Sequence, residues 1–189
     1  ISAMLMDEGL DTGPIVAVSH IDISNTETTG SLHDQLAALT ASCLCKVVDA
    51  APKSLEAPVP QSTNGVIYAP KITPADAMID WTRSAAVLDH HIRAFSPYPG
   101  AWCNGPKGRL RILQARPISL EETTLNIAPS PKAGRFLCRH DDGAMIIGCG
   151  DDALAIDRLQ PAGKSAMAAS DFLNGAGLVV GDLLDTTNQ

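Results

Sequence analysis

The most chemically suggestive residues near the N-terminus lie in a short loop rich in acidic residues and glycine. The stretch DEGLDTG places Asp7 and Asp11 beside Gly9 and Gly13. It follows an apolar run that predicts a strand, and ligand sites in open α/β sheets form at strand ends. Glycine lets the backbone approach a ligand closely, and a carboxylate accepts hydrogen bonds or a proton. The loop is a candidate binding site, and a tight turn that uses Asp and Gly for their backbone angles is the alternative.

A second candidate site is a basic segment within an acidic chain. The chain carries a formal net charge of −7, yet residues 107–139 hold seven Lys and Arg against two Asp and Glu. Salt screens distant charges beyond about 8 Å, so this segment can still meet phosphates. A solvated outer face of a sheet is the alternative. The candidate nucleic-acid-binding residues of this segment are Lys107, Arg109, Arg111, Lys132, Arg135 and Arg139.

The spacing of Arg109 and Arg111 favours binding to a phosphate backbone. They alternate with apolar residues, and in a strand this alternation sends both arginines to one face. A groove that follows phosphates requires such a face. The nearby aromatic residues are few, namely Trp102 and Phe136, so base stacking is not the expected mode of binding. We expect a nucleic acid to be held through its backbone and its shape.

Histidines and cysteines do not form a recognisable catalytic or metal-binding set. His90 and His91 are adjacent in a predicted helix, so their side chains diverge by about 100° and cannot bind one metal together. The other histidines, His20, His33 and His140, have no carboxylate or cysteine at ligand spacing. The five cysteines contain no C-x-x-C pair, which favours reduced structural thiols. We therefore expect no metal and no paired nucleophile and base.

In the first part of the chain, hydrophobic patterning predicts the elements that position these residues. Apolar runs at 1–6 and 14–23 predict strands on either side of the acidic loop. Residues 51–75 hold five prolines, which predicts a linker. Between them, Thr28 or Thr29 is placed to cap an amphipathic helix. Its apolar face consists of Leu32, Leu36, Leu39, Cys43 and Val47.

The rest of the chain predicts two helices followed by short strands. Thr73 as N-cap and Pro74 at the first helical position predict a helix to residue 81. Beyond residue 97, short apolar runs alternate with turn signals, of which Asp142–Gly143 is one. This pattern is typical of a small closed or partly open β-barrel of about five strands. A second helix is predicted by the apolar face of Val87, Leu88, Ile92 and Phe95.

Composition narrows the class of protein. Hydrophobic residues make up 45% of the 189 residues, which is enough for a folded core. No run approaches the roughly 18 apolar residues of a membrane span, and no signal peptide is evident. We expect a cytoplasmic protein. Because the sequence opens directly in a predicted strand, we also expect it to be part of a longer chain.

Three motifs in the chain resemble those of one enzyme family. They are MDEGLDTGPI, IDWTRSAAVLDHHIRAFSPYPGAW and LQPAGKSAMAASDFLNG. In this order and spacing the chain resembles the C-terminal part of the methionyl-tRNA formyltransferase family over about residues 4–175. That family transfers a formyl group from 10-formyltetrahydrofolate to the amino group of methionine on initiator tRNA.

The resemblance implies a fold and a set of domain boundaries. The fold would be an α/β remnant of a Rossmann-like formyltransferase domain followed by a C-terminal OB-type β-barrel domain. Residues 1–50 would end the catalytic domain, residues 51–75 would be the linker, and residues 76–189 would be the OB-type domain with its entry helices. The basic segment would contact the tRNA backbone, and Lys164 in the last motif would reach a phosphate.

The resemblance also implies what the chain lacks. The catalytic Asn, His and Asp of the family lie upstream of Ile1, so we expect this chain to hold no catalytic residue and to be inactive by itself. The loop with Asp7, Gly9, Asp11 and Gly13 would lie beside the folate. The partners would be initiator Met-tRNA and folate, with no membrane. The alternatives are a non-catalytic OB-type RNA-binding module and a related formyltransferase with a different acceptor.

Overall fold

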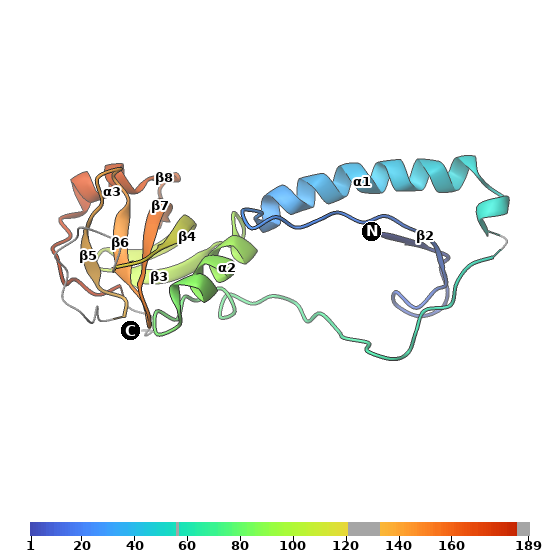
Figure 1. The fold of residues 1–189 in the computed structure, drawn as a ribbon, viewed down its shortest axis with the longest axis horizontal. Helices are drawn as coiled ribbons and strands as arrows, with labels where there is room; N and C mark the ends of the chain where they lie inside the picture. The colour runs from blue at the N-terminus through green and yellow to red at the C-terminus, as the bar shows by residue number, and fades with distance from the viewer. Residues whose placement is uncertain (56, 121–132, 185–189) are drawn as a thin grey trace. The chain divides into compact units, whose positions relative to one another are not determined.

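The computed structural model describes residues 1–55, 57–120 and 133–184 (Figure 1). The chain divides after Lys71 into two compact units, Ile1–Lys71 and Ile72–Gln189. They are described separately below.

The first unit contains a two-stranded sheet and a long helix. Strand β1 (Ser2–Met4) pairs antiparallel with β2 (Ile15–Val18), which confirms the two strands around the acidic loop. Helix α1 (Thr29–Asp49) begins at Thr28, whose hydroxyl accepts a hydrogen bond from the backbone N–H of Ser31. A short 3-10 helix, η1 (Lys53–Leu55), follows. The parallel sheet of a Rossmann-like fold is not present in residues 1–55 and 57–71, so the structure does not show the expected remnant.

The first unit buries little apolar surface. The five residues of the predicted apolar face of α1 are the buried Cys43 and four half-buried side chains. Among the described residues up to 71, Ala3 and Cys43 are the hydrophobic residues that are fully buried. Met6 and Leu10 in the acidic loop are 97% and 94% exposed. Helix α1 contacts β1 and β2 without a substantial core between them.

The second unit is a six-stranded antiparallel sheet with two helices. The strand order is β3-β4-β7-β6-β5, and β8 also pairs with β7. The predicted turns at Gly105–Pro106, Asp142–Gly143 and Gly150–Asp151 each connect two of the strands. The strands are β3 (Ala101–Gly105), β4 (Gly108–Ile118), β5 (Phe136–Arg139), β6 (Met145–Gly148), β7 (Ala153–Pro161) and β8 (Met167–Ala168).

A closed or partly open barrel was expected, and in the described residues the sheet is not closed into a barrel. Closure would pair the end strands β3 and β5, but each carries a different neighbour on its outer edge. The backbone of Trp102 in β3 exchanges hydrogen bonds with Ala77 and Ile79. The backbone of Phe136 in β5 exchanges hydrogen bonds with residues 181 and 182. Because local segments occupy these positions on both edges, β3 and β5 do not pair with each other there.

The helix predicted over residues 74–81 is wrong. Residues 73–76 form a turn in which the Asp76 carboxylate accepts hydrogen bonds from the backbone N–H and the hydroxyl of Thr73. The next residues are extended, since Ala77, Ile79 and Trp81 are buried in alternation along the edge of β3. A Thr-Pro-x-Asp sequence is compatible with a turn as well as with a helix start. The burial of every second residue after it is typical of extended chain, which excludes the helix.

Two helices cover parts of the sheet (Figure 1). Helix α2 (Ala85–Phe95) begins at Ser84, and its buried Leu88 and Ile92 confirm the predicted apolar face. It contacts β3, β4 and β7, and the core between them includes Ile112 and Ile156. Helix α3 (Ala169–Ala176) contacts β6, β7 and β8. It starts at Ala168 without a side-chain cap.

Candidate functional site

The acidic loop between β1 and β2 is held by bonds within the first unit. The Asp7 carboxylate accepts hydrogen bonds from the backbone N–H of Gly9 at 2.9 Å and from the Thr12 hydroxyl at 2.6 Å. Asp11 adopts a left-handed backbone conformation with φ of 57°, which Asp tolerates in turns. The loop therefore has the geometry of a tight turn, and Asp7 already has hydrogen-bond donors of its own.

Close packing at the base of this loop explains Gly13. A Cβ at Gly13 would lie 1.7 Å from the carbonyl oxygen of Leu5, so only glycine fits. The side-chain N–H₂ of Gln61 donates to the carbonyl oxygens of Asp11 and Gly13 at 2.8 and 2.7 Å. These bonds tie the loop to the extended chain after η1. The exposed residues that the loop offers a ligand include Leu10 and the acidic residues Glu8 and Asp11.

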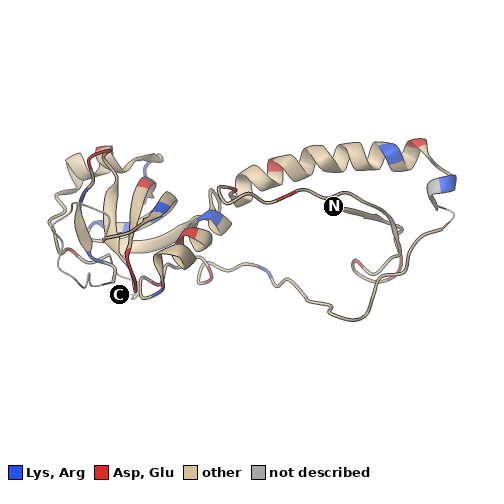
Figure 2. Cartoon of the chain, viewed as in Figure 1, with Lys and Arg blue, Asp and Glu red and all other residues tan. Residues whose placement is uncertain are grey.

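The basic face of β4 has the predicted alternation. Arg109 and Arg111 are exposed, whereas Leu110 and Ile112 between and after them are buried in the core. The guanidinium carbon of Arg109 lies 3.9 Å from the centre of the Trp102 ring, a cation–π contact. The stem of Arg111 lies against Gly100, where an added Cβ would be 3.1 Å from Arg111 Cδ. Both arginines thus extend from a firmly packed strand. Figure 2 shows Lys and Arg positions, in blue, on strands of the second unit.

Two further exposed cations lie on and beyond β7, and one of them was missed from the sequence. Lys164 is exposed in the turn that follows β7. The side chain of Gln160 donates to the carbonyl oxygen of Lys164 at 2.8 Å. Arg158 is exposed on β7 and was not predicted as a site residue. The alternation around Arg158 indicates an outward side chain, but its proximity to the basic residues of β4 depends on strand pairing.

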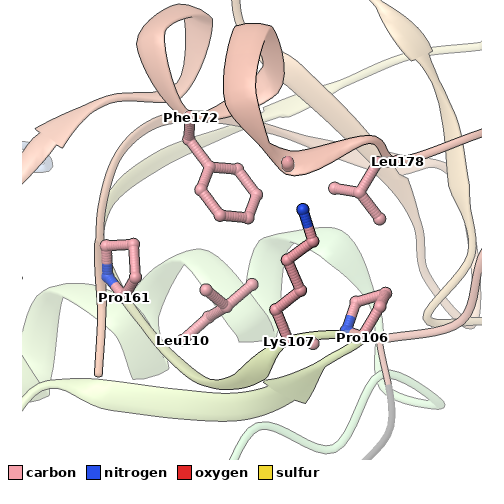
Figure 3. Close-up of a pocket in the computed structure, with 8 residues that line it drawn as sticks. Pro106, Lys107, Leu110, Pro161, Phe172 and Leu178 are labelled. Carbon is pink, nitrogen blue, oxygen red and sulfur yellow. The ribbon is translucent and has the colours of Figure 1, made fainter. Parts of the chain in front are cut away.

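Lys107 is engaged inside the second unit. Its Nζ donates to the carbonyl oxygen of Gly175 at 3.3 Å, at the C-terminal end of α3, where a positive charge is favourable. The lysine extends across a small cavity of about 30 Å³ between the β3–β4 turn and α3 (Figure 3). The cavity is mostly apolar and is lined by Gly105, Pro106, Lys107, Leu110, Pro161, Phe172, Ala176 and Leu178.

Arg135 and Arg139 are also bonded to other parts of the second unit. The guanidinium of Arg135 donates to the carbonyl oxygen of Gly181, in the segment that covers the edge of β5. Arg139 donates to the side-chain oxygen of Asn174 on α3 at 3.1 Å. Lys132 lies outside the described residues. The five described cations of the basic segment therefore do not all point freely to solvent, because Lys107, Arg135 and Arg139 bond within the second unit.

A charged cluster near the β5–β6 turn involves a further arginine. Arg116 donates to the carboxylates of Asp142 and Asp157, and His140 Nδ1 lies 2.8 Å from Asp142 Oδ1. The backbone N–H of Ala144 is the main cause that lowers the pKa of Asp142 to about 2, with contributions from His140 and Arg116. These ion pairs neutralise Arg116, so it is a structural residue rather than a phosphate ligand.

His91 is half-buried, and Cys103 and Cys149 are buried in the second unit. Burial lowers the pKa of His91, whose ring packs against Phe95 with the centroids 4.8 Å apart. All five cysteines are free, and burial raises the pKa of Cys103 and of Cys149 to about 12. In the part of the chain that the structure describes, no group of three or more His, Cys, Asp or Glu could hold a metal ion. None of the helices described is long and apolar enough to cross a membrane.

Residues 71–177 match the protein family described as "Formyl transferase, C-terminal domain". Three curated relatives carry the name methionyl-tRNA formyltransferase. Those of Parvibaculum lavamentivorans and Dechloromonas aromatica are each 41% identical over 96% of this chain, and that of Symbiobacterium thermophilum is 38% identical over 96%. The chain covers 56%, 55% and 54% of these proteins, so it spans about half of their length.

Solved structures show a related fold. HypX from Aquifex aeolicus, in a complex with tetrahydrofolic acid, matches 91% of this chain with a TM-score of 0.68 and 17% identity. A variant of the same protein matches 92% of the chain with a TM-score of 0.69. The chain covers 29% and 30% of those two HypX chains.

Proposed function

Since the chain belongs to the family of the formyl transferase C-terminal domain, we propose that it is the tRNA-holding part of a methionyl-tRNA formyltransferase. The observation that carries this proposal is identity of 38–41% over nearly the whole chain to proteins of that name. The protein would transfer a formyl group from 10-formyltetrahydrofolate to the amino group of methionine on initiator tRNA.

The proposed reaction divides the work between this chain and the part of the relatives that it does not cover. The methionine amine attacks the formyl carbon, a C–N bond forms, the bond to the folate nitrogen breaks, and the amine loses a proton. Such a step needs general acid–base groups and donors to the developing oxyanion. The described residues of this chain contain no such set, and we place these groups in the other part of the protein. The chain alone is then inactive.

Within this division, residues 76–189 hold the RNA, and their described strands belong to the open six-stranded sheet. Residues 1–50 end the catalytic domain, and residues 51–75 link the two. The loop containing Asp7, Gly9, Asp11 and Gly13 lies beside the folate. It contributes backbone groups and shape there, because the Asp7 carboxylate is already bonded to Gly9 and Thr12.

A chimera tests this function. The chain is joined to the preceding part of the Parvibaculum lavamentivorans relative and assayed with 10-formyltetrahydrofolate and initiator Met-tRNA. We expect the chimera to formylate the Met-tRNA and the 189-residue chain alone to form no product. Formylation by the chain alone would contradict the proposed division of labour. A chimera that formylates another amine in competition and leaves Met-tRNA unmodified would favour a related formyltransferase with a different acceptor.

A further inference from the structure

Three Asn–Gly pairs occur in the chain, and they lie in three different structural settings. They are Asn64–Gly65, Asn104–Gly105 and Asn174–Gly175. An Asn–Gly pair can modify itself without an enzyme, because glycine has no side chain to keep its backbone nitrogen away from the Asn side chain. The reaction requires a local backbone that can bring this nitrogen to the Asn amide carbon. The fold therefore decides which of the three pairs reacts.

The pair Asn104–Gly105 is held in a paired strand. Both residues belong to β3, where Asn104 lies opposite Arg109 and Gly105 lies opposite Gly108 of β4. An added Cβ at Gly105 would lie 2.7 Å from Leu110 Cδ1, so the chain is closely packed at this point. The reaction would first have to open part of the sheet. We therefore expect the fold to protect Asn104.

The pair Asn174–Gly175 is held in the last turn of α3. Helical geometry directs the backbone N–H of Gly175 toward the carbonyl oxygen four residues earlier, away from the side chain of Asn174. The side-chain oxygen of Asn174 accepts a hydrogen bond from Arg139 at 3.1 Å. The carbonyl oxygen of Gly175 accepts one from Lys107 at 3.3 Å. Both the attacking nitrogen and its target are thus restrained.

The pair Asn64–Gly65 lies in an exposed turn. Every residue from 59 to 76 is exposed, and residues 60–72 contain no helix or strand (Figure 1). Gly65 has φ of 77°, and a Cβ added there would meet no atom within 4 Å. Among the described residues, the one hydrogen bond of this pair runs from the backbone N–H of Asn64 to the Ser62 hydroxyl at 3.1 Å. That bond restrains neither the Asn64 side chain nor the nitrogen of Gly65.

We propose that Asn64 is a site of spontaneous deamidation in the folded protein, whereas Asn104 and Asn174 are protected. The backbone nitrogen of Gly65 loses its proton to solvent and attacks Cγ of Asn64. A C–N bond forms, the bond from Cγ to the side-chain nitrogen breaks, and that nitrogen leaves as ammonia. Water then opens the resulting cyclic succinimide at either carbonyl. The products are aspartate and isoaspartate, and no oxidant or reductant is needed.

The modification changes the charge and the backbone of the exposed segment 59–76. Each product adds one negative charge to a chain whose formal net charge is −7. Isoaspartate also lengthens the main chain by one carbon at residue 64. Because Gly65 has open space around it, the turn can accept either product without disturbing the core of the second unit. None of these steps depends on the proposed function.

The test is incubation of the full 189-residue chain at mildly alkaline pH, followed by peptide mapping with mass spectrometry that separates aspartate from isoaspartate. Trypsin cleaves after Lys71, Lys107 and Lys164, so the three pairs fall in different peptides. In the folded chain, Asn64 should convert at least about tenfold faster than Asn104 or Asn174, because these two react only after local opening. Equal rates at the three sites, or faster conversion at Asn104 or Asn174, would overturn the proposal.

Unfolded chain provides the control for sequence. In guanidinium chloride the three pairs share the same dipeptide and no longer differ in structure, so they should convert at similar rates. A preference for Asn64 that is equally large in the unfolded chain would assign the effect to neighbouring residues and overturn protection by the fold.

Two variants test the route and its consequence. Gly65→Ala places a side chain beside the attacking nitrogen and should slow the conversion of Asn64 severalfold, with Asn104 and Asn174 unaffected. Undiminished conversion would exclude attack by the nitrogen of residue 65. Asn64→Gln keeps the amide but would need a larger ring, so it should stay unmodified. The fully converted chain should retain the thermal unfolding midpoint of Asn64→Gln, and a lower midpoint would contradict the tolerance of this turn.

Discussion

Residues 72–184 bury large apolar side chains completely, whereas residues 1–71 leave most of theirs exposed. Ile112, Ile147 and Leu154 have no exposed surface, while Met6 and Leu10 are almost fully exposed. Since burial of apolar surface is the main source of folding free energy, the second unit contains its own source of stability and the first contains little. Hydrophobic patterning therefore predicts where a helix or strand forms, but not whether its apolar face is buried against another element.

The largest expected difference in stability is between two leucine-to-alanine variants, one in each unit. Leu154→Ala removes a side chain that is 0% exposed and should destabilise the second unit by about 2–5 kcal/mol. Leu44→Ala is the matched change on α1, where the leucine is 49% exposed, and should cost no more than about 0.5 kcal/mol. Both tryptophans, Trp81 and Trp102, lie in the second unit, so urea unfolding is followed by far-ultraviolet circular dichroism, which reports on both units. Similar losses in the two variants would contradict the view that the second unit holds the more substantial core.

The same difference explains which elements could be predicted. The strands around Arg109 and Ala155 were predictable because inward and outward residues alternate over a core that lies within the same unit. Helix α1 was predictable from its Thr28 cap and its 3.6-residue periodicity. The prediction of a helix after Thr73 was wrong because helix caps and turns use the same residue types. The following residues are extended because their backbone pairs with β3, and the local sequence does not indicate this pairing.

The candidate site was less predictable than the fold. Charge and spacing identified Arg109 and Arg111, whose outward direction depends only on local alternation. The partners of Lys107 and Arg139 lie on α3, 68 and 35 residues along the chain, and no local pattern indicates them. Arg158 was missed because its position beside the arginines of β4 depends on the pairing of β4 with β7, which neither strand's sequence indicates by itself.

Lowering the pH should have a smaller effect on the stability of the protein, and this effect should also differ between the two units. The pKa of Asp142 in the folded protein is about 2, below the usual 3.8, so its stabilising contribution is present above pH 3.8 and is lost as the pH falls through about 2. Asp142→Asn should therefore flatten the fall in stability between pH 4 and pH 2. Thermal unfolding midpoints across this range provide the measurement.

Glu27→Gln is the matched change in the first unit. The Ser31 hydroxyl, and then Gln35, lower the pKa of Glu27, but this carboxylate is fully exposed at the start of α1. Because solvent screens its interactions, we expect a weaker change in acid sensitivity than that of Asp142→Asn. A larger change from Glu27→Gln would contradict the view that the ordered charge network belongs to the second unit.

The two units also differ in what they offer a partner. Two exposed arginines of the second unit pack against neighbouring residues. Arg109 lies over the Trp102 ring, and Arg111 lies against Gly100. The acidic loop of the first unit presents exposed acidic residues, Glu8 and Asp11, and the apolar side chains of Met6 and Leu10 instead. A rigid strand holds a charged group in place before the ligand arrives, which suits RNA binding by the second unit.

Hydrogen exchange of the 189-residue chain with and without saturating initiator tRNA tests the central claim most directly. We expect slower exchange in β4, β7 and the turn at residues 162–166 when tRNA is bound, with residues 1–55 unchanged. Slower exchange confined to residues 1–55, or no change anywhere at saturation, would contradict RNA binding by the second unit.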